Sequence, residues 1–305
     1  MQSGVPGQGV VRPPARDAGI LVVALLAVST SGPLIAATVA PALAIAFWRN
    51  AMAGAVLTPV VLLRRREELK GLDRREWRLA LVAGLLLALH FATWIPALSY
   101  TSVASATALV ATQPVWSALI SKARGEAVSR QVWLGIAVAL SGALLLTGAD
   151  LQVSGNALLG DGLAVVGGLF AAGYMTAGSE VRRSVSTTTY TALCYSTTAL
   201  LLLVTCVVGG QALTGYDGRD WLKLIALTAG AQLLGHSLFN VVLKTTSPTV
   251  VSLSILFEIP GAALIAALFV KGQHVPLLAI PAAVLLVAGL ALVIRSSSRP
   301  SVPVE

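Results

Sequence analysis

The chain has 305 residues, of which 56% are hydrophobic and 11% are charged, and its formal net charge is +8. A soluble domain carries about a quarter charged residues, whereas no Asp, Glu, Lys or Arg occurs here between Arg78 and Lys122. This composition excludes soluble enzymes, nucleic-acid-binding domains and disordered chains. The excess of basic residues is typical of membrane proteins, whose cytoplasmic loops collect Lys and Arg.

Ten apolar segments are long enough to cross a bilayer, which takes about 20 mostly apolar residues. Because only helices and closed barrels satisfy their own backbone hydrogen bonds in hydrocarbon, continuous runs of this length predict helices. The first segment exceeds the apolar core of about 7–15 residues that is typical of a signal peptide, so we interpret it as a retained helix. In chain order the segments are residues 20–39, 42–63, 79–98, 102–120, 131–149, 158–177, 188–208, 222–243, 248–270 and 276–294.

The basic residues are divided unevenly between the two sides of this predicted membrane protein. With a cytoplasmic N-terminus, the cytoplasmic segments hold 17 Lys and Arg residues and the outside segments hold three, while Arg49 falls within a span. This bias predicts that both termini are cytoplasmic. The expected location is the cell membrane, which in a bacterium is the inner membrane.

The two halves of the chain resemble each other at an offset of about 145 residues. HFATWIPALSYTSVASATALVATQP in the first half corresponds to HSLFNVVLKTTSPTVVSLSILFEIP in the second, which pairs His90 with His236 and Gln113 with Glu258. Since five helices are an odd number, the second copy would enter the membrane from the opposite side, and such inverted repeats are typical of secondary transporters. We expect tails at 1–17 and 296–305 around repeats at 18–150 and 151–295; a duplication without a transport role is the alternative.

The motifs resemble those of EamA-type permeases of the drug/metabolite transporter superfamily over nearly the whole chain. FWRNAMAG contains Arg49, where that family usually has an arginine, and ARGEAVSRQVWLG contains a Gly125-Glu126 turn. The family's Glu-Pro pair is interrupted here as Glu258-Ile259-Pro260, and its second Gly-Glu turn reads Gly272-Gln273. The resemblance implies an all-α fold of ten transmembrane helices in two inverted five-helix repeats, a central cavity, and import or export of small metabolites.

Arg49 and Glu258 are the charged residues that fall well inside predicted spans. Counted along their helices they lie roughly 10 Å and 15 Å from opposite faces, which in a core of about 30 Å brings them to similar depths. Ionisable groups in the membrane tend to face a cavity or a partner. We expect Arg49 to hold an anionic group such as a substrate carboxylate and Glu258 to take a proton or an ammonium group. The alternative is a permanent ion pair that locks helices together.

Further polar and aromatic residues are candidates for the cavity wall. His90 and His236 could relay protons together with Glu258, although neutral, hydrogen-bonded imidazoles are the alternative. Trp94, Trp116, Tyr174, Tyr190 and Tyr195 could line the cavity, and ordinary packing is the alternative for each of them. The predicted cavity set is Arg49, His90, Trp94, Gln113, Trp116, Tyr174, His236, Asn240 and Glu258.

The chemistry of other sites is poorly supported. Cys194 and Cys206 are 12 residues apart, roughly 18 Å along a helix and beyond disulfide reach, so we expect buried thiols. No His, Cys or carboxylate cluster has metal-ligand spacing, and no cofactor motif occurs.

We therefore expect a secondary transporter for a small metabolite, amino acid or drug-like molecule, working by alternating access in the lipid bilayer. Among the modes of transport we expect export coupled to protons. The sequence patterns themselves do not identify the substrate, the direction of transport or the coupling ion. A membrane-embedded enzyme, or a structural or sensory protein, is the alternative, and a homodimer could form through the fifth and tenth helices. We predict no nucleic-acid partner.

Overall fold

The computed structural model describes residues 14–101, 103–147, 155–269 and 277–296, and within these ranges the regular structure is helical throughout. The predicted turn at Gly272-Gln273 and the outer parts of both predicted tails lie outside them. The helices are α1 (Ala15–Val28), α2 (Ser31–Ala36), α3 (Ala42–Arg64), α4 (Arg66–Gly71), α5 (Arg74–Tyr100), α6 (Val103–Val110), α7 (Gln113–Ala123), α8 (Arg130–Thr147), α9 (Gly155–Val181), α10 (Thr187–Val208), α11 (Gly218–Leu227), the π-helix η1 (Thr228–His236), α12 (Ser237–Val242), α13 (Pro248–Ile255), α14 (Glu258–Phe269) and α15 (Ala279–Ser296).

Polar caps define where several helices begin. Asp73 accepts a hydrogen bond from the Glu76 amide while the Glu76 side chain accepts from the Asp73 amide, which makes a capping box at the start of α5. Ser186, Asp217 and Ser247 cap α10, α11 and α13 with a side-chain oxygen. These caps satisfy amide groups that have no partner within the helix, at the ends where the apolar spans leave the hydrocarbon.

Seven helical stretches are long and apolar enough to cross a membrane, so the prediction of a helical multi-pass membrane protein is confirmed. They coincide with the first, second, third, sixth, seventh, eighth and tenth predicted segments: Ala15–Ala36, Ala42–Arg64, Arg74–Tyr100, Asn156–Val181, Thr187–Val208, Gly218–Val242 and Ala279–Ser296. The fifth segment forms α8, an 18-residue helix.

The fourth and ninth predicted segments, each expected as one continuous span, are each divided into two helices. The first break separates α6 from α7, and Pro114 lies in the first turn of α7, where its missing amide proton is tolerated. The second break separates α13 from α14, and Pro260 occupies the corresponding early position. The second piece begins at Gln113 in one half and at Glu258 in the other, the two residues that the repeat alignment pairs.

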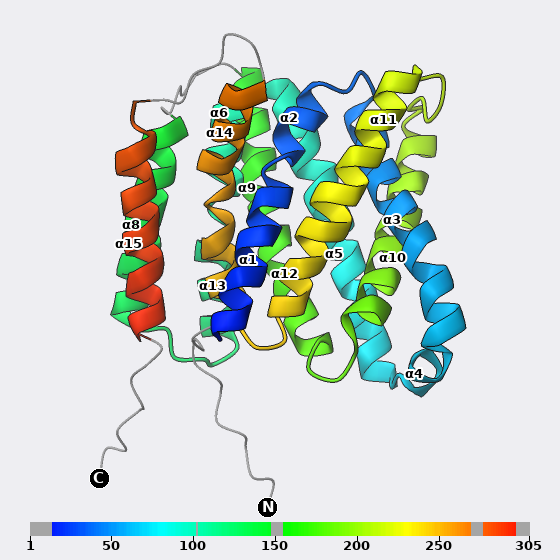
Figure 1. Ribbon diagram of the computed structural model, residues 1–305, viewed down its shortest axis with the longest axis horizontal. Coiled ribbons are helices and arrows are strands. Elements are labelled where there is room, and N and C mark those ends of the chain that lie inside the picture. The colour runs from blue at the N-terminus through cyan, green and yellow to red at the C-terminus, as the bar shows by residue number, and fades with distance from the viewer. Residues whose placement is uncertain (1–13, 102, 148–154, 270–276, 297–305) are drawn as a thin grey trace, which may run out of the picture.

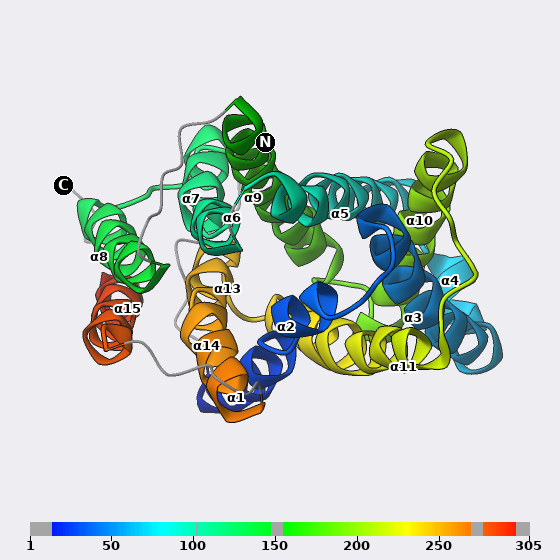
Figure 2. The same cartoon turned by 90° about the horizontal axis from the view of Figure 1, so that it is seen from above.

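Helices of the first half pack mainly on helices of the second half. The most extensive pairs are α5 with α9, α3 with α10 and α8 with α15, and further pairs include α1 with η1 and α7 with α13. Figures 1 and 2 show these pairs side by side, with α8 and α15 at one edge of the bundle. The α1–η1 contact joins the first and eighth predicted spans, and the α9–α5 contact joins the sixth and third. This reciprocity is what a two-fold relation between inverted halves produces.

The α8–α15 pair depends on glycine. A Cβ added to Gly289 would lie 2.5 Å from the Gly135 carbonyl oxygen and 2.7 Å from the Ala139 Cβ. Small residues of this kind let two membrane helices bring their backbones together. The opposite faces expose Leu134 and Val284, and the predicted homodimer through these helices stays a prediction.

Basic segments from the two halves meet at one end of the molecule, where α4, the start of α1 and the end of α15 lie (Figure 1). Arg75 of α5 and Arg183 each lie 3.3 Å from the buried Glu180 carboxylate. Glu68 accepts hydrogen bonds from the Ser186 amide at 2.6 Å and the Ser186 hydroxyl at 2.7 Å. The segments around 64–78 and 180–186 therefore lie on the same face, as the charge distribution predicts.

Glu68 gives this contact a pH dependence. Burial raises the pKa of Glu68, but hydrogen bonds from Ser186 and Thr189 and the nearby Arg65 guanidinium outweigh burial, so the pKa lies below the ordinary value of 4.5. When a carboxyl group has a lower pKa in the folded chain than in the unfolded chain, it stabilises the folded chain. This contribution is complete at pH values above the pKa of the unfolded chain, and it is lost as the pH falls through the pKa of the folded chain.

We expect Glu68→Gln to lower the thermal unfolding temperature at pH 7 because the variant lacks the carboxylate that the Ser186 donors bind. The difference from the wild type should shrink as the pH falls from about 5 to 3, since wild-type Glu68 is itself protonated there. Thermal unfolding of the detergent-purified protein across this range measures it. Glu67→Gln, at an exposed neighbouring carboxylate, is the control, and a deficit that stays constant with pH would contradict the assignment.

We expect Gly289→Leu to destabilise the protein by about 1–3 kcal/mol, because the added side chain overlaps the α8 backbone. Gly162→Leu in α9 is a matched control, since a Cβ at that position meets nothing within 4 Å. Equal unfolding temperatures for the two variants would show that the α8–α15 contact is not tight.

Candidate functional site

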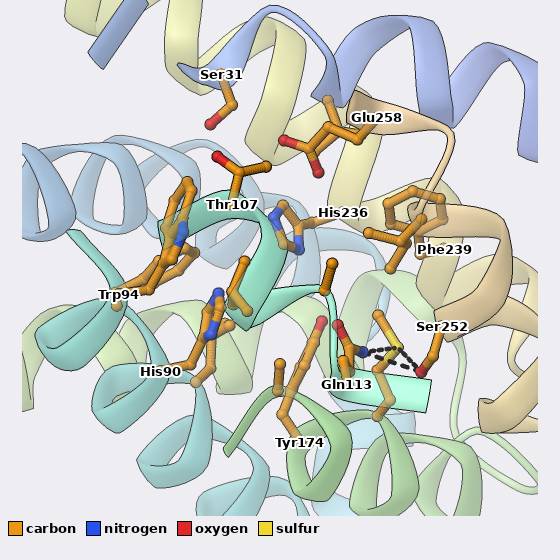
Figure 3. A pocket seen from close by; sticks show the side chains of 18 of the residues that line it. Ser31, His90, Trp94, Thr107, Gln113, Tyr174, His236, Phe239, Ser252 and Glu258 are labelled. Atoms are coloured by element: carbon orange, nitrogen blue, oxygen red, sulfur yellow. Dashed lines mark hydrogen bonds between the residues drawn. The ribbon is translucent and has the colours of Figure 1, made fainter. Parts of the chain in front are cut away.

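A cavity of about 70 Å³ lies where the two halves meet. Its wall comes from α1, α2, α3, α5, α6, α7, α9, η1, α12, α13 and α14, and most of it is apolar. Figure 3 shows side chains from these elements pointing toward one space, with Glu258, Thr107 and His236 on one side and His90, Tyr174 and Gln113 on the other. The cavity is large enough for a few water molecules.

Seven of the nine predicted cavity residues line this space, namely Arg49, His90, Trp94, Gln113, Tyr174, His236 and Glu258. Asn240 and Trp116 do not. Asn240 lies behind the wall, where its amide donates to the Tyr174 hydroxyl at 2.6 Å and to the His236 carbonyl at 2.9 Å. Trp116 was predicted because it lies about one helical turn from Gln113. In the structure, however, the residues of α7 that face the interior are Gln113 and Ser117.

Tyr190 and Tyr195, which were also candidates for the aromatic wall, are fully buried in the core and do not line the cavity. The Tyr195 hydroxyl lies 3.2 Å from the Ser237 hydroxyl. The alternative of ordinary packing holds for these two side chains.

Arg49 is fully buried and makes no ion pair with Glu258. Its Nε donates to Gln232 Oε1 at 2.8 Å, its Nη1 donates to Ser31 Oγ at 3.4 Å, and its Cζ lies 4.5 Å from the centroid of the Phe91 ring. Its Nη2 has no hydrogen-bond partner among the described residues. The permanent ion pair considered from the sequence is therefore not what this conformation contains.

Glu258 is the first residue of α14, and its carboxylate points into the cavity toward His236 and Thr107 (Figure 3). The positive end of a helix dipole favours a carboxylate at this position. The Ser29 hydroxyl lies 3.5 Å from the backbone carbonyl of Glu258, which joins the start of α14 to the end of α1. The break in the ninth segment thus places a carboxylate at the cavity wall.

The two histidines differ in their surroundings. His90 Nδ1 lies 2.9 Å from the Gly167 carbonyl oxygen, and because a carbonyl can only accept, Nδ1 carries the proton and Nε2 of the neutral ring is an acceptor. The His90 ring stacks on Trp94 with centroids 5.8 Å apart. His236 contacts Phe91 and Phe239 edge-on, and its buried Nδ1 has no partner among the described residues.

Four side chains in mutual contact lie between the cavity and the basic face. They are Gln113, Ser117, Met175 and Ser252, and we call them the partition. Gln113 Nε2 donates to Ser252 Oγ at 3.0 Å and contacts Met175 Sδ at 3.1 Å, and the hydroxyls of Ser117 and Ser252 are 3.0 Å apart. Figure 3 shows the contacts among Gln113, Met175 and Ser252 as dashed lines.

A second, wider cleft of about 670 Å³ lies beyond the partition at the basic face. The same three helices line both spaces: Ser121 of α7, Ser179 of α9 and Pro248 at the start of α13 face the cleft, as does Arg124 just after α7. Pro248 and Ser252 are one helical turn apart, so the partition is about one turn thick.

Several residues of the site were missed from the sequence. Gln232, Asn50, Ser31 and Ser252 are polar but uncharged. Uncharged residues were predicted only where the repeat alignment or the helix face of a histidine indicated them, as for Gln113 and Asn240. Phe91 could not be distinguished from other aromatic residues of the third segment.

The sequence profile of the EamA-like transporter family matches residues 17–148 and 158–295, so that one copy falls on each half. The chain belongs to the EamA-like transporter family. The resemblance inferred from the motifs is thereby confirmed.

The remaining comparisons are less specific. No curated protein matches the chain. A solved structure described only as "Crystal structure of protein" aligns with a TM-score of 0.74 and 20% identity, covering 91% of this chain and 96% of that one. At this identity the likeness concerns the fold alone.

We expect the partition to slow the access of reagents from the basic face to the cavity. A cysteine at Ser179, which faces the cleft, should react with a membrane-impermeant maleimide from the basic side at least about tenfold faster than one at Ala171, which lines the cavity two turns away on α9. The natural Cys194 and Cys206 are buried and free, and the unsubstituted protein measures their background.

Replacing Gln113 and Ser252 by Ala in the Ala171→Cys protein should raise that cysteine's labelling rate, because the polar contacts that hold the partition are removed. Equal labelling of positions 171 and 179 in the unsubstituted background would show that no barrier separates the two spaces.

Proposed function

We propose that this chain is a secondary transporter that moves a small, carboxylate-bearing metabolite of amino-acid size across the cell membrane by alternating access. Membership of a transporter family supports the general class. The observation that carries the proposal is the cavity between the halves. There a carboxylate faces the same space as a buried arginine that forms no ion pair with any residue the structure describes. Charged groups at this depth are costly and mark substrate or ion pathways.

The ten-span topology is part of this proposal. Seven helices are long enough to span, and we add α8, the broken pair α6–α7 and the broken pair α13–α14. Discontinuous helices with their breaks near the midplane are typical of transporters, because the freed backbone groups and helix N-termini can face a substrate there. The N-termini of α7 and α14 meet the cavity at Gln113 and Glu258.

The wall suits a ligand with an anionic group, a cationic group and an apolar body. Arg49 Nη2 offers a donor for a carboxylate oxygen. Glu258 would take an ammonium group or a proton, and the Trp94, Phe91 and Phe239 rings would contact the body of the ligand. Since the cavity holds about 70 Å³, the walls move apart when a ligand of this size binds.

The partition and the cleft supply a route to one side of the membrane. When the contacts of Gln113 with Ser252 and Met175 separate, the cavity would open to the wide cleft at the basic face. The Lys and Arg bias assigns this face to the cytoplasm. Loading from that side corresponds to export, and protonation of Glu258, with His236 and His90 nearby, is the proposed coupling step.

Counterflow in proteoliposomes tests the proposal. Vesicles loaded with an unlabelled amino acid should accumulate the labelled form transiently, without chemical change to it, for at least one member of a panel of the common amino acids. Arg49→Gln should abolish uptake of that carboxylate while the protein still folds. Loss of label by reaction, or no uptake for any panel member, would count against the proposed activity.

Glu258→Gln tests proton coupling in the same vesicles. Counterflow by the variant should become independent of pH between about 5 and 8, because the group that takes up the proton is gone. Glu67→Gln, at an exposed carboxylate on α4, is the matched control and should keep the wild-type profile. An unchanged pH profile in Glu258→Gln would reject Glu258 as the proton carrier.

A further inference from the structure

A chain of amides holds the Arg49 guanidinium without neutralising its charge. Gln232 Oε1 accepts from Arg49 Nε at 2.8 Å, and Gln232 Nε2 donates to Asn50 Oδ1 at 3.1 Å. Asn50 Nδ2 in turn donates to the Ala46 carbonyl oxygen at 2.8 Å. The side chains of Arg49, Asn50 and Gln232 are all fully buried, so this chain is shielded from solvent.

The Ala46 carbonyl oxygen, at the end of this chain of hydrogen bonds, determines which group donates and which accepts in each of them. The Ala46 carbonyl can only accept, so the NH₂ group of Asn50 must face it and the Asn50 oxygen must face Gln232. That oxygen requires a donor, which turns the NH₂ group of Gln232 toward Asn50 and its oxygen toward Arg49. A flipped Gln232 would place two donors against each other, so Arg49 meets a neutral acceptor.

A carboxylate would be the ordinary partner for a buried guanidinium, because an unpaired buried charge is expensive. Gln232 has the length and shape of Glu but carries no charge. Glu258, which shares the cavity, does not come within ion-pair distance of Arg49. Arg49 is thus oriented at Nε and has no direct counter-ion among the described residues, since Glu258 acts on its charge only from a distance. Its Nη2 has no hydrogen-bond partner among the same residues.

Gln232 lies in the π-helix η1, which also carries the cavity residue His236. A π-helical turn is rare and is frequently found at functional sites. Here it connects α11 to α12 and presents one amide to α3 and one imidazole to the cavity. The same irregular segment therefore positions the cation and forms part of the ligand's wall.

We infer that Gln232 is the residue that sets charge selectivity: as a neutral, fixed acceptor it reserves the Arg49 charge for a carboxylate of the ligand. This inference rests on the proposed transport function and deepens it by naming the ligand group that the site selects. Gln232 is a positioning residue, since it acts through Arg49. Glu at this position would supply an internal counter-ion 2.8 Å from Arg49 Nε and compete with the ligand.

The test compares each amino acid of the counterflow panel with its amide, which keeps the ammonium group and side chain but lacks the carboxylate. Affinities come from ligand-induced thermal stabilisation of the purified full-length protein. The wild type should prefer the carboxylate, and Gln232→Glu should weaken carboxylate binding at least about tenfold while amide binding is retained or strengthened. Sodium chloride and sodium nitrate serve as probes for a site that takes any small anion.

Gln113→Glu is the matched control, because it adds the same charge to the cavity wall at a side chain whose hydrogen-bond contacts are with Ser252 and Met175 and not with Arg49. It should change the carboxylate-to-amide preference much less than Gln232→Glu. Gln232→Met keeps the site neutral and should retain a preference for the carboxylate, which also covers the case in which Gln232→Glu does not fold. Equal effects of the two Glu variants, or loss of preference in Gln232→Met, would overturn the inference.

The two proposals fail differently. If the wild type shows no preference for any carboxylate over its amide, or binds chloride and nitrate equally well, the proposed substrate class is wrong and the role of Gln232 is wrong with it. If the wild type prefers the carboxylate and Gln232→Glu keeps that preference, the transport proposal stands and Gln232 does not set the selectivity.

Discussion

A positive charge buried in a membrane protein is costly unless it meets a counter-ion or binds a ligand. Arg49 makes no ion pair within the part of the chain that the structure describes. Its guanidinium is fully buried, bound to an amide and a hydroxyl, and placed over an aromatic face. Each of these contacts satisfies or shields the group while leaving its charge intact. The helices around it are arranged so that this charge meets a cavity rather than lipid.

The broken helices follow from the same constraint. Backbone groups at a helix break cannot face lipid, so a break at membrane depth is stable only where protein or a cavity surrounds it. The breaks before Gln113 and Glu258 both occur at the cavity. The two breaks fall at the residues that the predicted repeat alignment pairs, although Gln113 belongs to a hydrogen-bonded partition and Glu258 to an open wall.

Much of this architecture could be predicted from the sequence because it depends on strong, local signals. Runs of apolar residues gave the helical membrane class, and the family resemblance is confirmed by the profile match. Arg49, Glu258 and the two histidines were found because ionisable groups are rare in spans. Asn240 and Trp116 were misplaced because helical spacing alone does not say which face turns inward, and the π-helix ending at His236 has no reliable sequence signature. Gln232 was missed since its importance arises from a contact between residues 183 positions apart.

The glycine contact between α8 and α15 has a mechanical consequence. The two helices come from opposite halves, yet Gly135 and Gly289 bring their backbones into direct contact at one edge of the bundle. Sliding would force Ala139 and its neighbours through space that only glycine leaves vacant. The contact therefore resists sliding of α8 along α15, so relative motion at this edge would be limited to small changes in the angle between the two helices.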